Sequence, residues 1–229
     1  MIGILEAGAP PAGLAAQWGS YGDMLRALLG PELPAQVFDA QAAPLPDPGS
    51  CRGWLISGSP AAAYDSDGWI GALRSFILNV PQTAPLVGIC FGHQLMAQAF
   101  GGIVAKGPDL ALGLQEYRII DRAEWMEGAG ESLRLPASHQ DQVQSIGPDA
   151  HLLAGNAFNR FGMLSYRCRR AMSLQLHPEF EPGFAAALVE LRRGKMGDAA
   201  ADEAAASLQQ PNDRERVAGW IRAFIGPAA

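Results

Sequence analysis

Cys90 lies between two glycines at the end of a short apolar stretch, Gly88-Ile89-Cys90-Phe91-Gly92. Gly-x-Cys-x-Gly is the cysteine counterpart of the Gly-x-Ser-x-Gly nucleophile elbow, a sharp turn from strand to helix. At the start of such a helix, free amide hydrogens and the helix dipole favour the reactive thiolate. A buried structural cysteine is the simpler alternative, because free cysteines are often buried. The two flanking glycines favour a nucleophile, with the Phe91 amide directed at a developing oxyanion.

A thiol nucleophile needs a base, and His177 is the best candidate among the four histidines. Pro178 fixes the local backbone, and Glu179 could orient the imidazole and stabilise its cation. His-Pro-Glu taken alone is also compatible with an ordinary surface histidine. Together with the cysteine elbow upstream, it predicts a Cys90–His177–Glu179 triad.

The elements that must position these residues follow an α/β pattern, with short apolar runs alternating with helical periodicity. In the first half we expect strands over residues 1–5, 35–40, 53–57 and 85–89 and helices over 18–29 and 69–80. The second half is typical of antiparallel pairing, with short strands over residues 114–120, 131–136, 142–146, 151–154 and 161–166. Residues 171–177 alternate cleanly, so that Ser173, Gln175 and His177 share one face of a strand.

The C-terminal part is expected to be helical. A helix is predicted over residues 183–193, and an alanine-rich stretch and an apolar stripe follow over 198–206 and 217–224. We therefore divide the chain into one domain over residues 1–193 and a C-terminal helical extension over 194–229, packed on the same domain.

Composition narrows the classes of partner. The 229 residues carry a formal net charge of −6, and no cluster of Lys and Arg could neutralise phosphates, so nucleic acid is not an expected partner. No run of eighteen apolar residues could span a membrane, and the N-terminus has no secretory signal pattern. Three widely spaced cysteines do not make a disulfide framework. We expect a cytoplasmic protein.

The segments Gly-Ile-Cys-Phe-Gly-His-Gln and His-Pro-Glu together resemble the class I glutamine amidotransferase family, over residues 1 to about 193. The resemblance implies a three-layer α/β fold of the flavodoxin-like kind, with a mostly parallel central sheet and flanking helices. It also implies that Cys90 attacks the side-chain amide of glutamine and forms a γ-glutamyl thioester. His177 would be the general acid/base, and Glu179 its orienting partner.

The same resemblance suggests further site residues. The segment Ser57-Gly58-Ser59-Pro60 lies where the family has a Gly-Gly-Pro oxyanion loop. Ser59 replaces the second glycine, so its backbone N–H can still donate beside that of Phe91, but its φ must suit a non-glycine residue. By analogy, the amino-acid end of the substrate would contact Gln94 and an expected loop at residues 138–141, and the candidate binding residues there are Ser138, Gln140 and Asp141.

Ser59 and residues 138–143 resemble stand-alone members such as γ-glutamyl peptidases, and the chain is also similar to the glutaminase domain of GMP synthase. Two hypotheses therefore stay open. One is a glutaminase that passes ammonia to a separate synthetase subunit, and the other is a self-sufficient hydrolase of γ-glutamyl peptides or amines. An inactive or redox-sensing relative is a third, against which the intact His177–Glu179 pair argues.

No cofactor or metal is expected. Cys90 and His93 have the spacing of half a zinc site, but no second Cys/His pair accompanies them. Neither a phosphate-binding loop nor a dinucleotide-binding glycine pattern follows a predicted strand. The expected partner is a small γ-glutamyl substrate.

Overall fold

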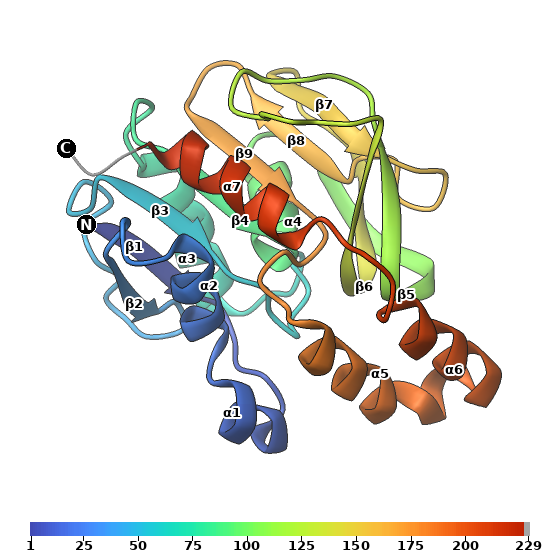
Figure 1. Ribbon diagram of the computed structural model, residues 1–229. Coiled ribbons are helices and arrows are strands. Elements are labelled where there is room, and N and C mark those ends of the chain that lie inside the picture. The colour runs from blue at the N-terminus through green and yellow to red at the C-terminus, as the bar shows by residue number, and fades with distance from the viewer. Residues whose placement is uncertain (227–229) are drawn as a thin grey trace.

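The computed structural model describes residues 1–226, and its centre is a nine-stranded mixed sheet with helices on both faces (Figure 1). The strand order is β2-β1-β3-β4-β9-β8-β7-β5-β6. The α/β fold predicted from the alternating sequence pattern is confirmed, and so are the three layers that the family resemblance implies. The strands from β2 to β9 in this order pair in parallel. The other four strand pairs, which involve β9, β8, β7, β5 and β6, are antiparallel.

The parallel half of the sheet is built from five short strands. These are β1 (Ile2–Glu6), β2 (Ala35–Asp39), β3 (Gly53–Ile56), β4 (Leu86–Ile89) and β9 (Ala171–Leu174). Every residue of β3, β4 and β9 is buried, as expected for strands covered on both faces. Ile89 pairs with Leu174, so β4 and β9 end side by side. Residues that follow these two strands are therefore brought to one edge of the sheet.

The antiparallel half consists of β5 (Ile103–Ile119), β6 (Ser132–Ser145), β7 (Ala150–Gly155) and β8 (Met163–Tyr166). The expectation of a loop over residues 138–141 is wrong, because these residues lie inside β6, and Ser138, His139 and Asp141 pair with β5. The two strands predicted over 131–136 and 142–146 are thus one. The β5–β6 register shifts between Lys106 and Ala111, and the two strands pair on both sides of this irregularity. The pairing therefore continues through the polar segment.

Seven helices are described within residues 1–226: α1 (Ala12–Trp18), α2 (Tyr21–Leu29), α3 (Gly68–Asn79), α4 (Phe91–Ala99), α5 (Pro182–Met196), α6 (Asp198–Ser207) and α7 (Arg214–Ile225). Successive side chains of β1 lie on opposite faces of the sheet and belong to different apolar clusters. Ile4 packs in one cluster with α2 and α7, whereas Leu5 packs in another with α3 and α4. A third apolar cluster joins α1, α5 and α6 below the β5–β6 hairpin (Figure 1).

The C-terminal segments are helical, as the alanine-rich stretch and the apolar stripe predicted. The helix expected over 183–193 continues to Met196, three residues further. In α7, Val217, Trp220 and Ile221 are almost fully buried against the central sheet. Trp220 Nε1 also donates a hydrogen bond of 2.7 Å to the carbonyl of Glu127.

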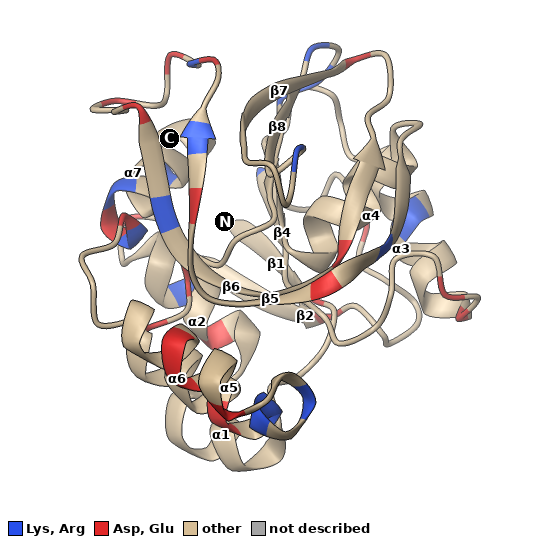
Figure 2. Ribbon diagram, turned by 90° about the vertical axis from the view of Figure 1, so that its right-hand side faces the viewer, with Lys and Arg blue, Asp and Glu red and all other residues tan. Residues whose placement is uncertain are grey.

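The view in Figure 2 shows charged residues of both signs. Lys and Arg alternate with Asp and Glu over the elements visible in Figure 2, and neither sign covers a whole face of that view. None of the helices within residues 1–226 has both the length and the apolar content that crossing a bilayer requires.

Candidate active site

The chain turns sharply at Cys90, between the end of β4 and the first residue of α4. Cys90 has φ 52° and ψ −102°, and it is the only non-glycine residue with a positive φ within residues 1–226. Such a backbone costs about 1–3 kcal/mol and persists only where the surroundings impose it. Here the Cys90 N–H donates to the carbonyl of Leu174 at 2.9 Å, which ties the turn to β9. The strand–turn–helix elbow expected from the sequence is present.

Close packing around the elbow explains the two glycines. A Cβ on Gly88 would lie 2.6 Å from the backbone of Gly92, and a Cβ on Gly92 would lie 2.5 Å from the carbonyl oxygen of Ile56. Both distances are well inside van der Waals contact, so any side chain would push α4 away from the sheet. The glycines therefore allow the N-terminus of α4 to approach β3 and β4 directly behind Cys90.

His177 and Glu179 form a buried ion pair beside the elbow. Glu179 Oε1 lies 2.7 Å from His177 Nδ1, and the two side chains are 1% and 3% exposed, respectively. The His177 ring stacks on Phe180 with a centroid distance of 3.9 Å and an interplanar angle of 6°. The carboxylate and the stacked phenyl ring together fix the plane of the imidazole and leave Nε2 as its free nitrogen.

Electrostatics favour the imidazolium form of His177. Burial alone would lower the pKa of this side chain, but the negative charges of Glu179 and Cys90 outweigh burial and raise it above its ordinary value. His177 and Cys90 also line the same cavity, and a Cβ on Gly58 would approach both: His177 Cε1 at 3.2 Å and Cys90 Cβ at 3.7 Å. Nε2 makes no well-formed hydrogen bond within residues 1–226, although a side-chain hydrogen bond with Cys90 is among the causes that raise the pKa of His177. It is available for proton transfer.

Gln175 is a site residue that the sequence reasoning missed. Its Nε2 lies 3.5 Å from Cys90 Sγ, and its Oε1 accepts a bond of 3.1 Å from Gln94 Nε2. Gln94 Nε2 also donates to the carbonyl of Asp141 at 2.9 Å. A chain of amide groups thus connects β6 to the thiol. The strand alternation already placed Gln175 on the face of His177, and this was the signal that could have identified it.

The segment predicted to form an oxyanion loop accommodates Ser59 in place of glycine. The φ of Ser59 is not positive, so the side chain causes no backbone strain of the kind that favours glycine. Its Oγ accepts a bond of 3.1 Å from the N–H of Ala61 and helps to shape the loop. Phe91 is the first residue of α4, where N–H groups have no acceptor within the helix.

The residues expected at the substrate's amino-acid end share one cavity of about 380 Å³ with Cys90. It is lined by Ser59, Gln94, Ser138, Gln140 and Asp141. Two basic residues of α5, Arg192 and Lys195, line it too, and sequence reasoning did not identify them. Arg192 Nη1 donates to Ser138 Oγ at 2.7 Å. Basic residues near a helix C-terminus are common for reasons of the helix dipole, so their sequence position carried no signal of a site.

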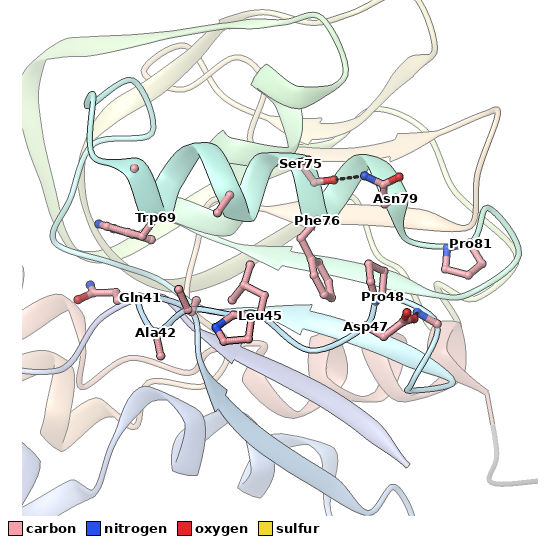
Figure 3. Close-up of a pocket in the computed structure, with 16 residues that line it drawn as sticks. Gln41, Ala42, Leu45, Asp47, Pro48, Trp69, Ser75, Phe76, Asn79 and Pro81 are labelled. Carbon is pink, nitrogen blue, oxygen red and sulfur yellow. Dashed lines mark hydrogen bonds between the residues drawn. The ribbon is translucent and has the colours of Figure 1, made fainter.

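His93 stays outside this cavity. Its Nδ1 lies 2.8 Å from Ser173 Oγ, and burial lowers its pKa to about 3, so the ring is neutral. A larger cavity, of about 840 Å³, lies between α3 and the proline-rich segment that follows β2, with Leu45, Trp69 and Phe76 in its walls (Figure 3). None of the predicted catalytic or binding residues lines that cavity.

Comparison with known proteins finds a matching family and several relatives. Residues 31–190 match the family model "Glutamine amidotransferase class-I". The chain is 32% identical to gamma-glutamyl peptidase 4 of Arabidopsis thaliana over 174 residues, which cover 71% of this chain and 69% of that protein. It is also 32% identical over 129 residues to a glutamine-hydrolysing GMP synthase of Desulfotalea psychrophila, with 56% of this chain and 24% of that protein covered.

A solved structure supports the fold. A glutamine amidotransferase from Thermotoga maritima superposes with a TM-score of 0.74 at 14% identity, over 98% of this chain and 95% of that chain. Because the family model spans most of the chain and includes the cysteine elbow and the His-Pro-Glu segment, this protein belongs to the class I glutamine amidotransferase family.

Proposed function

We propose that this protein hydrolyses a γ-glutamyl amide through a thioester on Cys90, with His177 as general acid/base and Glu179 as the partner that orients His177. The observation that carries the proposal is the strained backbone of Cys90 at a helix N-terminus, beside a buried His177–Glu179 pair. This arrangement supplies a nucleophile, a proton carrier and a group that fixes the proton carrier.

In the first half of the reaction, Cys90 Sγ attacks the γ-carbonyl carbon. The new S–C bond moves an electron pair onto the carbonyl oxygen, which accepts hydrogen bonds from the N–H groups of Ser59 and Phe91. The C–N bond then breaks as the His177 imidazolium gives its proton to the departing nitrogen. Ammonia leaves if the substrate is glutamine, and an amine leaves if it is a γ-glutamyl peptide.

In the second half, the now neutral imidazole of His177 accepts a proton from water, and the resulting hydroxide attacks the thioester carbon. The C–S bond breaks, glutamate leaves, and the thiolate–imidazolium pair is restored. No oxidant or metal takes part in either half.

The 380 Å³ cavity suits the amino-acid end of a γ-glutamyl group. Gln94, Ser138 and Gln140 offer polar contacts in its wall. Asp141 and Lys195 have opposite charges, as the α-ammonium and α-carboxylate groups of the substrate require.

Two leaving groups are candidates, and each has support from a relative. The match to a γ-glutamyl peptidase favours a self-sufficient hydrolase, and the match to a glutamine-hydrolysing GMP synthase favours glutamine and a separate synthetase subunit. The chemistry on Cys90 is the same in both. We place this activity in the cytoplasm, where a free thiol stays reduced.

A trapping experiment tests the reaction itself. The purified chain is mixed with glutamine or with a panel of γ-glutamyl dipeptides, glutamate release is measured, and an acid-quenched sample is searched by mass spectrometry for a γ-glutamyl group on the Cys90 peptide. Cys90→Ser should lose turnover and the adduct while it keeps the circular dichroism spectrum of the wild type. Cys168→Ser, at an exposed cysteine, is the matched control and should retain both. Turnover in a clean Cys90→Ser preparation would refute the assignment.

A further inference from the structure

Two cavities meet at Cys90. The 380 Å³ cavity described above extends along β6, and a second cavity of about 260 Å³ extends in the direction of α2 and α5. They share Ser59, Pro60, Cys90, Ser138 and Arg192. A substrate bound at Cys90 can therefore occupy space on both sides of the sulfur.

The chemistry decides which part of the substrate enters each cavity. The departing nitrogen must receive its proton from His177, so it lies on the side of that ring. His177 lines only the second of these two cavities, and Gln94 and Asp141 line only the first. The glutamyl chain therefore lies toward β6, and the leaving group lies in the 260 Å³ cavity.

This second cavity is much larger than ammonia requires. One molecule of water, which is close to ammonia in size, occupies roughly 30 Å³ in the liquid. The inner wall is apolar and buried, with Phe180 and Leu188 2% and 3% exposed. The Tyr21 ring stacks on Phe180 at a centroid distance of 5.7 Å, and Ala9 and Pro11 form an exposed rim. An apolar side chain on the leaving amine would fill this space.

The charge of the cavity lining further limits which leaving groups it favours. Apart from the Cys90–His177 pair, the charged residue in its lining is Arg192, and no Asp or Glu lines it. The guanidinium has five N–H donors, of which Ser138 Oγ takes one, so others remain for an anion. A leaving group with a carboxylate is favoured here, and one with a second ammonium group is disfavoured.

We propose that the 260 Å³ cavity is a leaving-group subsite and that the preferred substrate is a γ-glutamyl dipeptide whose second residue has an apolar side chain. The inference rests on the function proposed above. In the reaction, the amide C–N bond breaks, the α-amino nitrogen of the apolar amino acid takes the proton from His177, and its carboxylate pairs with Arg192.

The first test compares kcat/KM of the purified chain for five substrates: γ-glutamylleucine, γ-glutamylglycine, γ-glutamyl-3-methylbutylamide, γ-glutamylputrescine and glutamine. The butylamide is the leucine dipeptide without its carboxylate. We expect γ-glutamylleucine to exceed each of the others by about tenfold or more, the discrimination that a filled apolar pocket provides. If glutamine is hydrolysed and γ-glutamylleucine is no better than glutamine or γ-glutamylglycine, the inference is wrong while the proposed function stands. If no substrate is hydrolysed, both are wrong.

Substitutions in the subsite test its assignment. Ala9→Phe fills the exposed rim and should lower the γ-glutamylleucine-to-glutamine ratio of kcat/KM about tenfold or more. Ala16→Phe, at an exposed position of α1 outside the lining, is the matched control and should leave that ratio unchanged. Arg192→Gln should bring γ-glutamylleucine and its butylamide analogue to similar values. If Arg192→Gln lowers both equally, the arginine serves the glutamyl end, and the proposed carboxylate contact is overturned. A preference for γ-glutamylputrescine would overturn the charge selection.

Discussion

The substitution Glu179→Gln separates the charge of this residue from its geometry. Glu179 Oε1 lies 2.7 Å from His177 Nδ1, and both side chains are almost completely buried. A glutamine amide oxygen can occupy the same position and accept the same N–H bond, but it has no negative charge. Burial, which lowers the pKa of His177, is then opposed only by the charge and the hydrogen bond of Cys90.

The size of the effect follows from the contact. An opposite charge at this distance shifts a pKa by about 1–3 units, and each unit corresponds to about 1.4 kcal/mol. In the wild type the raised pKa keeps His177 protonated as the pH rises, so the general acid is present and is lost only above that pKa. In Glu179→Gln the alkaline limb of kcat/KM should move to lower pH by about 1–3 units. As the pH approaches the wild-type pKa, the imidazolium fraction of the variant falls to about a tenth to a thousandth of the wild-type fraction, and kcat/KM falls with it.

The assay is a pH profile of kcat/KM for γ-glutamyl hydrolysis across the neutral and alkaline range. The matched control is Glu181→Gln, an exposed glutamate two residues further along the chain, whose profile should coincide with that of the wild type. If the alkaline limb of Glu179→Gln coincides with that of the wild type, Glu179 does not set the protonation of His177. Its role would then be limited to orientation.

Three further substitutions test other parts of the site. His177→Ala should cost nearly as much kcat/KM as loss of Cys90, because triad members act as a unit; a near-normal rate would mean that another group is the base. Gln94→Ala should raise KM several-fold, the effect of losing about 0.5–1.5 kcal/mol of hydrogen bonding, whereas a lower melting temperature with unchanged KM would show that Gln94 only braces its neighbours. Gln175→Leu removes the amide N–H beside Cys90 Sγ and should slow the alkylation of Cys90 by iodoacetamide at a fixed pH; an unchanged rate of alkylation would contradict its role at the thiol.

The parts of the site that sequence could predict are local. At Cys90, the apolar strand, the two glycines and the following helix lie in one short stretch of the chain. Each glycine is required for a local steric reason, because a Cβ there would clash with neighbouring backbone. The His177–Glu179 pair spans one intervening residue, so its contact needs no knowledge of the tertiary fold. The layered fold was predictable for a similar reason, because fully apolar strands such as β4 require cover on both faces.

The parts that sequence could not predict depend on pairing between distant segments. Residues 138–141 are polar and were expected to form a loop, but they pair with β5 across its register shift. Tertiary pairing overrides their weak strand propensity. Arg192 reaches Ser138 only because α5 packs against the β5–β6 hairpin, and no spacing in the sequence encodes that contact.

The strand expected over residues 171–177 is shorter, and this difference matters for catalysis. β9 ends at Leu174, where its pairing with Ile89 of β4 and Met163 of β8 also ends. Beyond Leu174 the chain leaves β4 but stays anchored, because the N–H groups of Gln175 and His177 donate to the carbonyls of Gly162 and Pro136 at 2.9 Å each. In this position Gln175 Nε2 lies 3.5 Å from Cys90 Sγ, and His177 lines the cavity beside it.

In the function that we propose, the chemistry and the choice of substrate therefore depend on different parts of this fold. Cys90 and His177 follow β4 and β9, two paired parallel strands, and their geometry is set by the ladder that both share. The walls of the two cavities come from elsewhere, because β6, α5 and the segment around α1 and α2 line the substrate on either side of the sulfur. A substitution in those walls can change the leaving group that is accepted without moving the strands that align sulfur and imidazole. In the reaction that we propose, both candidate leaving groups share the same chemistry on Cys90, and residues such as Leu188 and Arg192 select the amine that departs.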